Sequence, residues 1–114
     1  MIPQQGYLLR IFIGESDKYE GKPLFEWLVE SAREQGLAGA TVLRGIMGYG
    51  GRSRIHTSKI MRLSEDLPIV VELVDTHEKL EAFLESIDDI IGEGLATLEK
   101  AEVKFYRSGS LSTE

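Results

Sequence analysis

The chain has 114 residues and a mass of 12.7 kDa, so we expect a single domain over residues 1–114 with one hydrophobic core. Its 42% hydrophobic and 28% charged residues are typical of a globular protein. The net charge of −6 disfavours a general binder of nucleic acid or anionic membranes. The absence of cysteine excludes disulfides, thiol nucleophiles and iron–sulfur clusters. No apolar run approaches the ~20 residues of a membrane span and no secretory signal is visible, so we expect a cytoplasmic protein.

The first third of the chain predicts a strand followed by a helix. Residues 7–13 are rich in β-branched and aromatic side chains, which indicates a strand buried on both faces. Residues 15–21 are polar and predict a loop. Apolar side chains at helical spacing then predict a helix over 22–35, with Pro23 in its first turn and Gly36 as a left-handed cap at its end.

The remaining elements alternate in the same way. Residues 39–44 predict a second strand, 60–63 a short strand, and the apolar run 69–74 a third long strand. Thr76 can cap a second helix. Its apolar stripe consists of Leu80, Phe83, Leu84, Ile87, Ile90 and Ile91. Residues 103–106 predict the last strand, and 108–114 a polar tail.

The order strand, helix, strand, strand, helix, strand predicts an α+β fold of the ferredoxin-like type. Right-handed crossovers bring both helices to one face of a four-stranded antiparallel sheet, with the first and third long strands in the middle. Because side chains alternate along a strand, the other face of this sheet is also apolar. It would carry Leu8, Phe12, Val70, Val74 and Tyr106. That face needs a cover, and self-association supplies it, so we predict an oligomer.

Positive charge and glycine are concentrated in one stretch. The segment from Arg44 to Arg62 has five basic residues and no acid, whereas residues 63–102 have twelve acids and two bases. Six of the twelve glycines lie between Gly36 and Gly51. One interpretation is a solvated hairpin loop. The other is an anion site, in which glycines let backbone N–H groups approach the ligand and arginines supply the counter-charge.

Two glycine clusters are candidates for such a site, at residues 45–51 and 92–94. Neither matches a Walker loop or a dinucleotide fingerprint. The first is equally consistent with a flexible hairpin loop, and the second with a helix C-cap and turn.

Other chemistry has little support in the sequence. His56 and His77 have no metal-ligand spacing and are more typical of surface or capping residues. Ser58 lies near His56 but lacks the strand–nucleophile–helix context of a hydrolase. The acids of the second helix are most simply its solvated face.

Four stretches of the sequence resemble the PII-like signalling proteins, and most closely the branch filed as domain of unknown function family 190. They are residues 39–50, 53–57, 63–72 and 92–99. With the matching order of elements, the resemblance covers about residues 5–108.

The resemblance implies a homotrimer of ferredoxin-like subunits whose sheets face inward. It also implies an adenine nucleotide in each cleft between neighbouring subunits. The loop at residues 48–60 would change shape on binding and engage a protein partner, such as a membrane transporter or an enzyme. No nucleic-acid partner and no required cofactor are implied.

The same resemblance assigns the site residues by motif. Gly48, Tyr49 and Gly50 match a glycine-aromatic-glycine run that lines the phosphates. Gly92, Glu93 and Gly94 match a glycine-acid-glycine turn around the phosphate oxygens. Facing the base are Thr41 and the backbone of Val74, and Arg107 lies near a basic position that reaches the phosphates.

Two departures bear on the ligand. Leu95 stands where PII proteins have a lysine, and Phe105 and Arg107 stand where they have two basic residues, with Lys104 as a possible substitute. Fewer cations favour AMP or ADP over ATP, unless Arg52 and Arg54 of the loop fold back to compensate. Two alternatives remain. One is an enzyme that slowly hydrolyses the nucleotide, with Glu93 positioning water. The other is a metal-responsive trimer of the CutA kind, which the lack of cysteine and of paired histidines disfavours.

Overall fold

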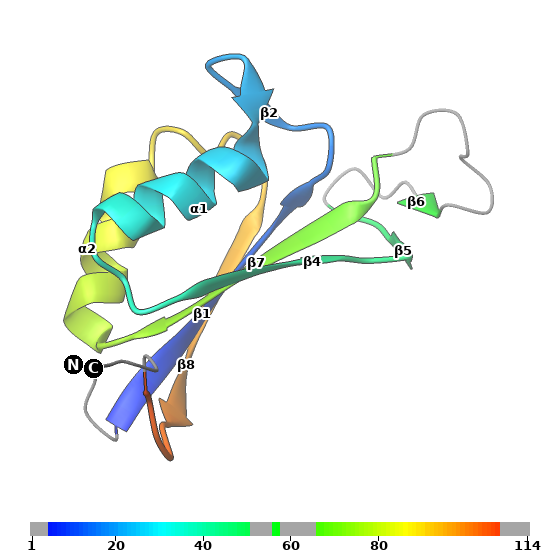
Figure 1. The fold of residues 1–114 in the computed structure, drawn as a ribbon. Coiled ribbons are helices and arrows are strands. Elements are labelled where there is room, and N and C mark those ends of the chain that lie inside the picture. The colour runs from blue at the N-terminus through cyan, green and yellow to red at the C-terminus, as the bar shows by residue number, and fades with distance from the viewer. Residues whose placement is uncertain (1–4, 51–55, 58–65, 108–114) are drawn as a thin grey trace.

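The computed structural model describes residues 5–50, 56–57 and 66–107, and its main feature is a four-stranded antiparallel sheet (Figure 1). The strand order is β4-β7-β1-β8. These strands are β1 (Gln5–Gly14), β4 (Ala40–Arg44), β7 (Pro68–Asp75) and β8 (Leu95–Glu102). The prediction that the first and third long strands are central is confirmed, because β1 and β7 lie in the middle of the sheet.

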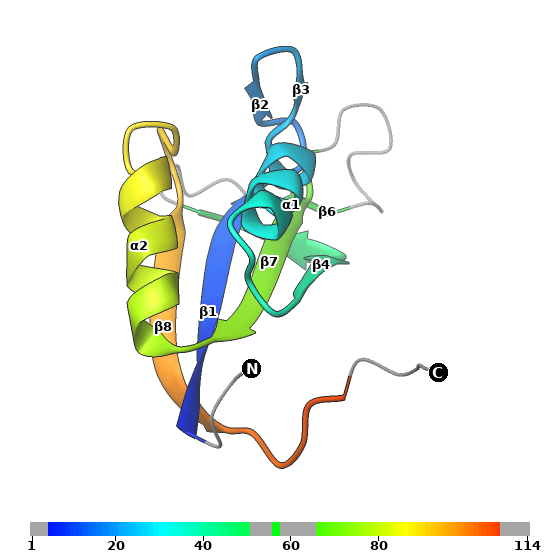
Figure 2. The same cartoon turned by 60° about the vertical axis from the view of Figure 1, so that its left-hand side comes forward.

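Two helices cover one face of the sheet, as Figure 2 shows. Helix α1 (Leu24–Glu34) ends in the expected left-handed cap, where Gly36 has φ +80° and its N–H donates to the carbonyl of Arg33 (3.0 Å). Pro23 stands directly before the helix rather than inside its first turn. Helix α2 (His77–Ile87) begins at the predicted cap, since the Thr76 hydroxyl accepts from the N–H of Lys79 (3.2 Å).

The core lies between this face and the helices. Alternate residues of β1 and β7 point into it and are at most 6% exposed. They pack against the buried side chains of the two helices, Leu24, Leu28, Ala32, Leu80, Phe83 and Ile87. The expected alternation is therefore confirmed, and the side chains between them, such as Leu8 and Phe12, face the uncovered side of the sheet.

The uncovered face is partly apolar and partly charged. Phe12 pairs with Val70 on one side and Leu95 on the other, and Val70 pairs with Leu43, so these four residues form a row across all strands of the sheet. Leu43 and Leu95 are 48% and 59% exposed. The adjacent row has Arg10 at its centre.

Two predictions about the second half of the chain are wrong. The last strand is Leu95–Glu102, not 103–106, because it must run beside β1 from Phe12 back to Gln5. Consequently Tyr106 does not belong to the sheet face. Helix α2 ends at Ile87, and Ile90 and Ile91 lie in the turn that follows. The predicted strand at 60–63 and the tail at 108–114 lie outside the described residues.

The polar segment at 15–21 contains a small hairpin that the sequence did not predict. Its strands are β2 (Lys18–Tyr19) and β3 (Lys22–Pro23). Glu20 and Gly21 form the turn with φ of +53° and +82°. A further short pair, β5 (Met47–Gly48) and β6 (His56–Thr57), follows β4.

Candidate functional site

The two glycine bends lie at the same end of the sheet but at opposite edges. The N–H of Gly45, directly after β4, donates to the carbonyl of Pro68 (2.7 Å), and Pro68 pairs with Gly14 at the end of β1. Gly94, directly before β8, lies against the carbonyl of Phe12, two residues earlier in β1. Strands β7 and β1 separate the two edges, and three strand spacings of about 4.8 Å make the separation about 14 Å.

Three of the bend glycines are closely packed, and two of them, Gly45 and Gly94, have no room for a side chain. A Cβ on Gly45 or Gly48 would lie 2.8 or 3.0 Å from Cγ of Pro68, and a Cβ on Gly94 would lie 2.8 Å from the backbone oxygen of Phe12. Gly94 therefore lets the turn approach β1, which is a structural reason for its identity.

Two more of the described bend glycines, Gly50 and Gly92, have no such packing contact, and Gly51 lies outside the described residues. No described atom lies within 4 Å of a Cβ built on either, and neither has positive φ. Of the alternative interpretation as a helix C-cap and turn, the turn is confirmed, because Gly92 and Gly94 lie in the bend after α2. Neither glycine is a left-handed cap, since neither has positive φ and α2 is followed by Asp88 in right-handed conformation. A glycine that its own fold does not require leaves backbone open to a ligand.

The remaining candidates are spread along both edges. Thr41 on β4 pairs with Glu72, so it faces the uncovered side of the sheet, as Val74 does. Leu95 opens β8 beside a surface depression of about 350 Å³ that also includes Gly94. Tyr49 is 69% exposed. The side chain of Arg52 lies outside the described residues, as do those of His56 and Ser58.

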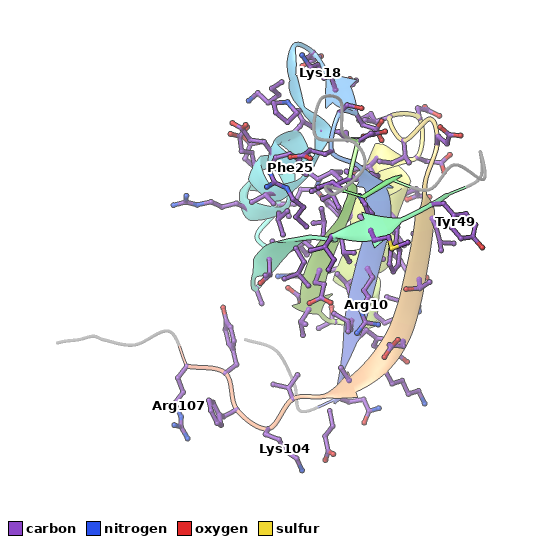
Figure 3. The ribbon with its side chains drawn as sticks, turned by 90° about the vertical axis from the view of Figure 1, so that its right-hand side faces the viewer. Arg10, Lys18, Phe25, Tyr49, Lys104 and Arg107 are labelled. Carbon is purple, nitrogen blue, oxygen red and sulfur yellow. The ribbon has the colours of Figure 1, made fainter. Side chains whose placement is uncertain are left out.

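The two basic candidates of the C-terminal segment lie at the opposite end of the molecule from Tyr49, as Figure 3 shows. Lys104 is paired with Glu102 (3.4 Å), and the Arg107 guanidinium stacks 4.4 Å from the ring centroid of Phe105. A single chain thus does not bring Lys104 or Arg107 to the glycine bends.

The C-terminal segment nevertheless reaches the other edge of the sheet. It leaves β8 and runs past the end of the sheet towards β4 (Figure 2), and the Tyr106 hydroxyl donates to the carbonyl of Ala38 (2.9 Å). The N–H of Ala38 donates to the buried carboxylate of Asp75 (2.8 Å), which also accepts from Thr76 (2.6 Å). These bonds hold the C-terminal segment, through Tyr106, to Ala38, which lies two residues before β4, the strand that carries Thr41.

Two charged clusters lie on the same surfaces as these candidates. Arg10, at the centre of the uncovered face (Figure 3), donates to Glu72 (3.0 Å) and Glu99 (3.1 Å). The hydrogen bond to Glu72 raises the pKa of Arg10 above its usual value, so it stays charged. At the glycine end, Arg44 pairs with Glu15 (2.5 Å between Nη2 and Oε2).

No pattern in the sequence identifies the contact between Arg44 and Glu15. The absence of acid in residues 44–62 was a signal that any partner of Arg44 must come from elsewhere, but only the fold identifies it as Glu15.

The described part of the chain offers neither a metal cluster nor a membrane span. Residues 5–50, 56–57 and 66–107 contain no group of three or more His, Asp or Glu that could hold a metal ion. His77 is half exposed, contacts Glu81 (3.4 Å) and packs its ring edge-on against Tyr7. Neither described helix is long and apolar enough to cross a membrane.

Comparisons with known structures define the class. The fold matches CPII of Thiomonas intermedia K12, a nitrogen regulatory PII-like protein bound to ADP, AMP and bicarbonate, with a TM-score of 0.68 and 17% identity over 89% of this chain and 90% of that one. It also matches a putative PII-like signaling protein of Thermus thermophilus, with a TM-score of 0.57 and 20% identity over the same shares. The chain therefore has the PII-like, ferredoxin-like fold.

Sequence comparisons then identify the branch. Residues 6–103 match the model of DUF190, described as Uncharacterized ACR, COG1993, and the chain belongs to this family. A UPF0166 protein of Aquifex aeolicus (strain VF5) is 49% identical over 96 residues, 84% of this chain and 90% of its own. A UPF0166 protein of Methanocaldococcus jannaschii is 36% identical over 84 residues, 74% and 77% respectively. The predicted resemblance to the PII-like proteins is confirmed.

Proposed function

We propose that this protein is a regulatory homotrimer that binds one adenine nucleotide in each cleft between neighbouring subunits and performs no chemistry on it. The observation that carries the proposal is the position of the two glycine bends, at one end of the sheet and at opposite edges. The nucleotides bound to CPII, which shares the fold, give independent support.

The geometry favours a site between chains. Within one chain the bends are about 14 Å apart across β7 and β1, too far to hold the same phosphate group. In a ring of copies, the β4 edge of one chain meets the β8 edge of the next, and one bend from each adjoins the other. The same ring would cover the apolar row that includes Leu43 and Leu95.

The proposed ligand contacts divide by edge. Phosphates would be bound by the backbone at Gly48, Tyr49 and Gly50 from one chain and at Gly92, Glu93 and Gly94 from its neighbour. The proposed set is completed by Thr41, Val74, Arg52, Leu95, Lys104 and Arg107. Because Leu95 supplies no charge and Lys104 already pairs with the carboxylate of Glu102, we propose AMP or ADP as the preferred ligand over ATP.

The signal would pass through the loop at 48–60. A nucleotide held at the root of this loop stabilises one of its conformations, and a protein partner, such as a transporter or an enzyme in the cytoplasm, then binds that conformation.

Isothermal titration calorimetry with AMP, ADP and ATP tests the proposal, together with light scattering to measure the assembly. We expect a trimer, one nucleotide per chain, micromolar affinity and weaker binding of ATP. Trypsin cleavage at Arg52, Arg54 and Lys59 should slow when the nucleotide is added. A monomer, or the absence of heat with all three nucleotides, would refute the proposal.

A further inference from the structure

The Arg44–Glu15 ion pair joins the glycine bend to the loop after β1. Arg44 is the last residue of β4 and directly precedes Gly45, which packs against Pro68 together with Gly48. The Arg44 side chain is 59% exposed, so an incoming group can reach it, whereas the Glu15 side chain is 27% exposed.

Glu15 is fixed in place by its backbone. Its N–H donates to the carbonyl of Leu67 (2.8 Å), and the next N–H, of Ser16, donates to the carboxylate of Asp66 (2.8 Å). These bonds fix the backbone at Glu15, and the ion pair places its carboxylate beside Arg44 at the end of the sheet where the bends lie. A carboxylate and a phosphate offer the same kind of oxygen pair to a guanidinium.

We infer that Arg44 is a nucleotide-binding residue and that Glu15 is an internal competitor, which occupies the guanidinium until a phosphate group replaces it. This inference rests on the proposed function. It adds a residue that determines the affinity for the nucleotide and the discrimination between ADP and AMP. The segment 44–62 has no acid of its own, so the competing carboxylate must come from another element, and Glu15 is the residue in contact.

The exchange has a structural consequence. Before it, Glu15 contacts both ends of the segment between β4 and β7, through its side chain at Arg44 and through its backbone at Leu67. After it, only the contact at Leu67 remains. The occupied state therefore differs from the empty one in how β4 is connected to the loop after β1.

The test compares the Kd of two single variants, Arg44→Gln and Glu15→Gln. The two Kd values shift in the same direction if the ion pair is only structural, and in opposite directions if Glu15 competes with the nucleotide. If Arg44 binds phosphate, Arg44→Gln should raise the Kd for ADP roughly fivefold, while Glu15→Gln should lower it roughly two- to fivefold. The double variant should match Arg44→Gln, because the competitor has no effect once its target is gone. Both effects should be larger for ADP than for AMP.

A matched control removes the same charge elsewhere. Glu30 pairs with Lys22 (2.7 Å) on the outer surface of α1, so Glu30→Gln changes the net charge as Glu15→Gln does. It should leave the Kd unchanged. Equal tightening by Glu30→Gln, or weakening by both Glu15→Gln and Arg44→Gln, overturns the inference while the proposed function stands. No binding of any adenine nucleotide by the unmodified protein overturns both.

Discussion

Two glycines of one turn, Gly92 and Gly94, allow the requirements of the fold and of the ligand to be separated. A Cβ on Gly94 would lie 2.8 Å from the backbone oxygen of Phe12, so Gly94→Ala forces the turn away from β1. Overpacking costs about 1–3 kcal/mol, and the lower entropy of the unfolded alanine chain returns about 0.4–1 kcal/mol. With mid-range values of about 2 and about 0.7 kcal/mol, the net loss should be about 1.3 kcal/mol.

Gly92→Ala should behave in the opposite way. No described atom is near its added Cβ and its φ is not positive, so stability should stay level or rise by about 0.4–1 kcal/mol. If the Gly92 backbone donates to a phosphate, the methyl group blocks the approach. Loss of one charge-assisted hydrogen bond of about 1.5 kcal/mol then raises the Kd roughly tenfold.

Urea unfolding and calorimetry with ADP measure the two effects separately. Protein concentration must be equal in all samples, because unfolding of an oligomer depends on it. If Gly92→Ala binds ADP as tightly as the unmodified protein, the backbone of this turn does not contact the nucleotide. If Gly94→Ala is as stable as the unmodified protein, the close contact with Phe12 does not constrain the turn.

Three further changes test the fold and its assembly. Glu20→Gly should stabilise the protein by up to about 1 kcal/mol in urea unfolding, because Glu20 has φ +53° and glycine relieves the strain; equal or lower stability contradicts this. Phe12→Asp introduces charge on the uncovered face, so light scattering should show a monomer with an intact far-ultraviolet circular dichroism spectrum; a trimer that persists would show that this face is not the interface. Asp75→Asn leaves one of the N–H groups of Ala38 and Thr76 without its acceptor and should cost about 1–3 kcal/mol; an unchanged urea midpoint would refute this.

Much of the fold could be predicted because local patterns and global topology agree. The apolar strands β1 and β7 are the central ones, and Thr76 and Gly36 act as the expected caps. The error at the C-terminus has a physical reason. Strand β8 is a mostly exposed edge strand in which two leucines are mixed with small and charged residues, so the more apolar segment at 103–106 gave the stronger strand pattern.

The candidate site could be predicted only in part. The glycine bends were visible as clusters, but which glycines the fold requires depends on contacts with Pro68 and Phe12 that no local pattern contains. The pairing of Arg44 with Glu15 was equally invisible, because the two residues lie in segments joined only by the tertiary structure.

The separation of the bends links ligand binding to assembly. If one nucleotide contacts the β4 edge of one chain and the β8 edge of the next, its binding free energy also stabilises the contact between them. The central ion pairs of Arg10 with Glu72 and Glu99 lie on the face that a trimer would bury. Such pairs contribute little net stability when desolvated, but they penalise misaligned neighbours. In this scheme, the apolar row provides the affinity between chains and the Arg10 cluster aligns them. The two bends make the assembly depend on the bound nucleotide.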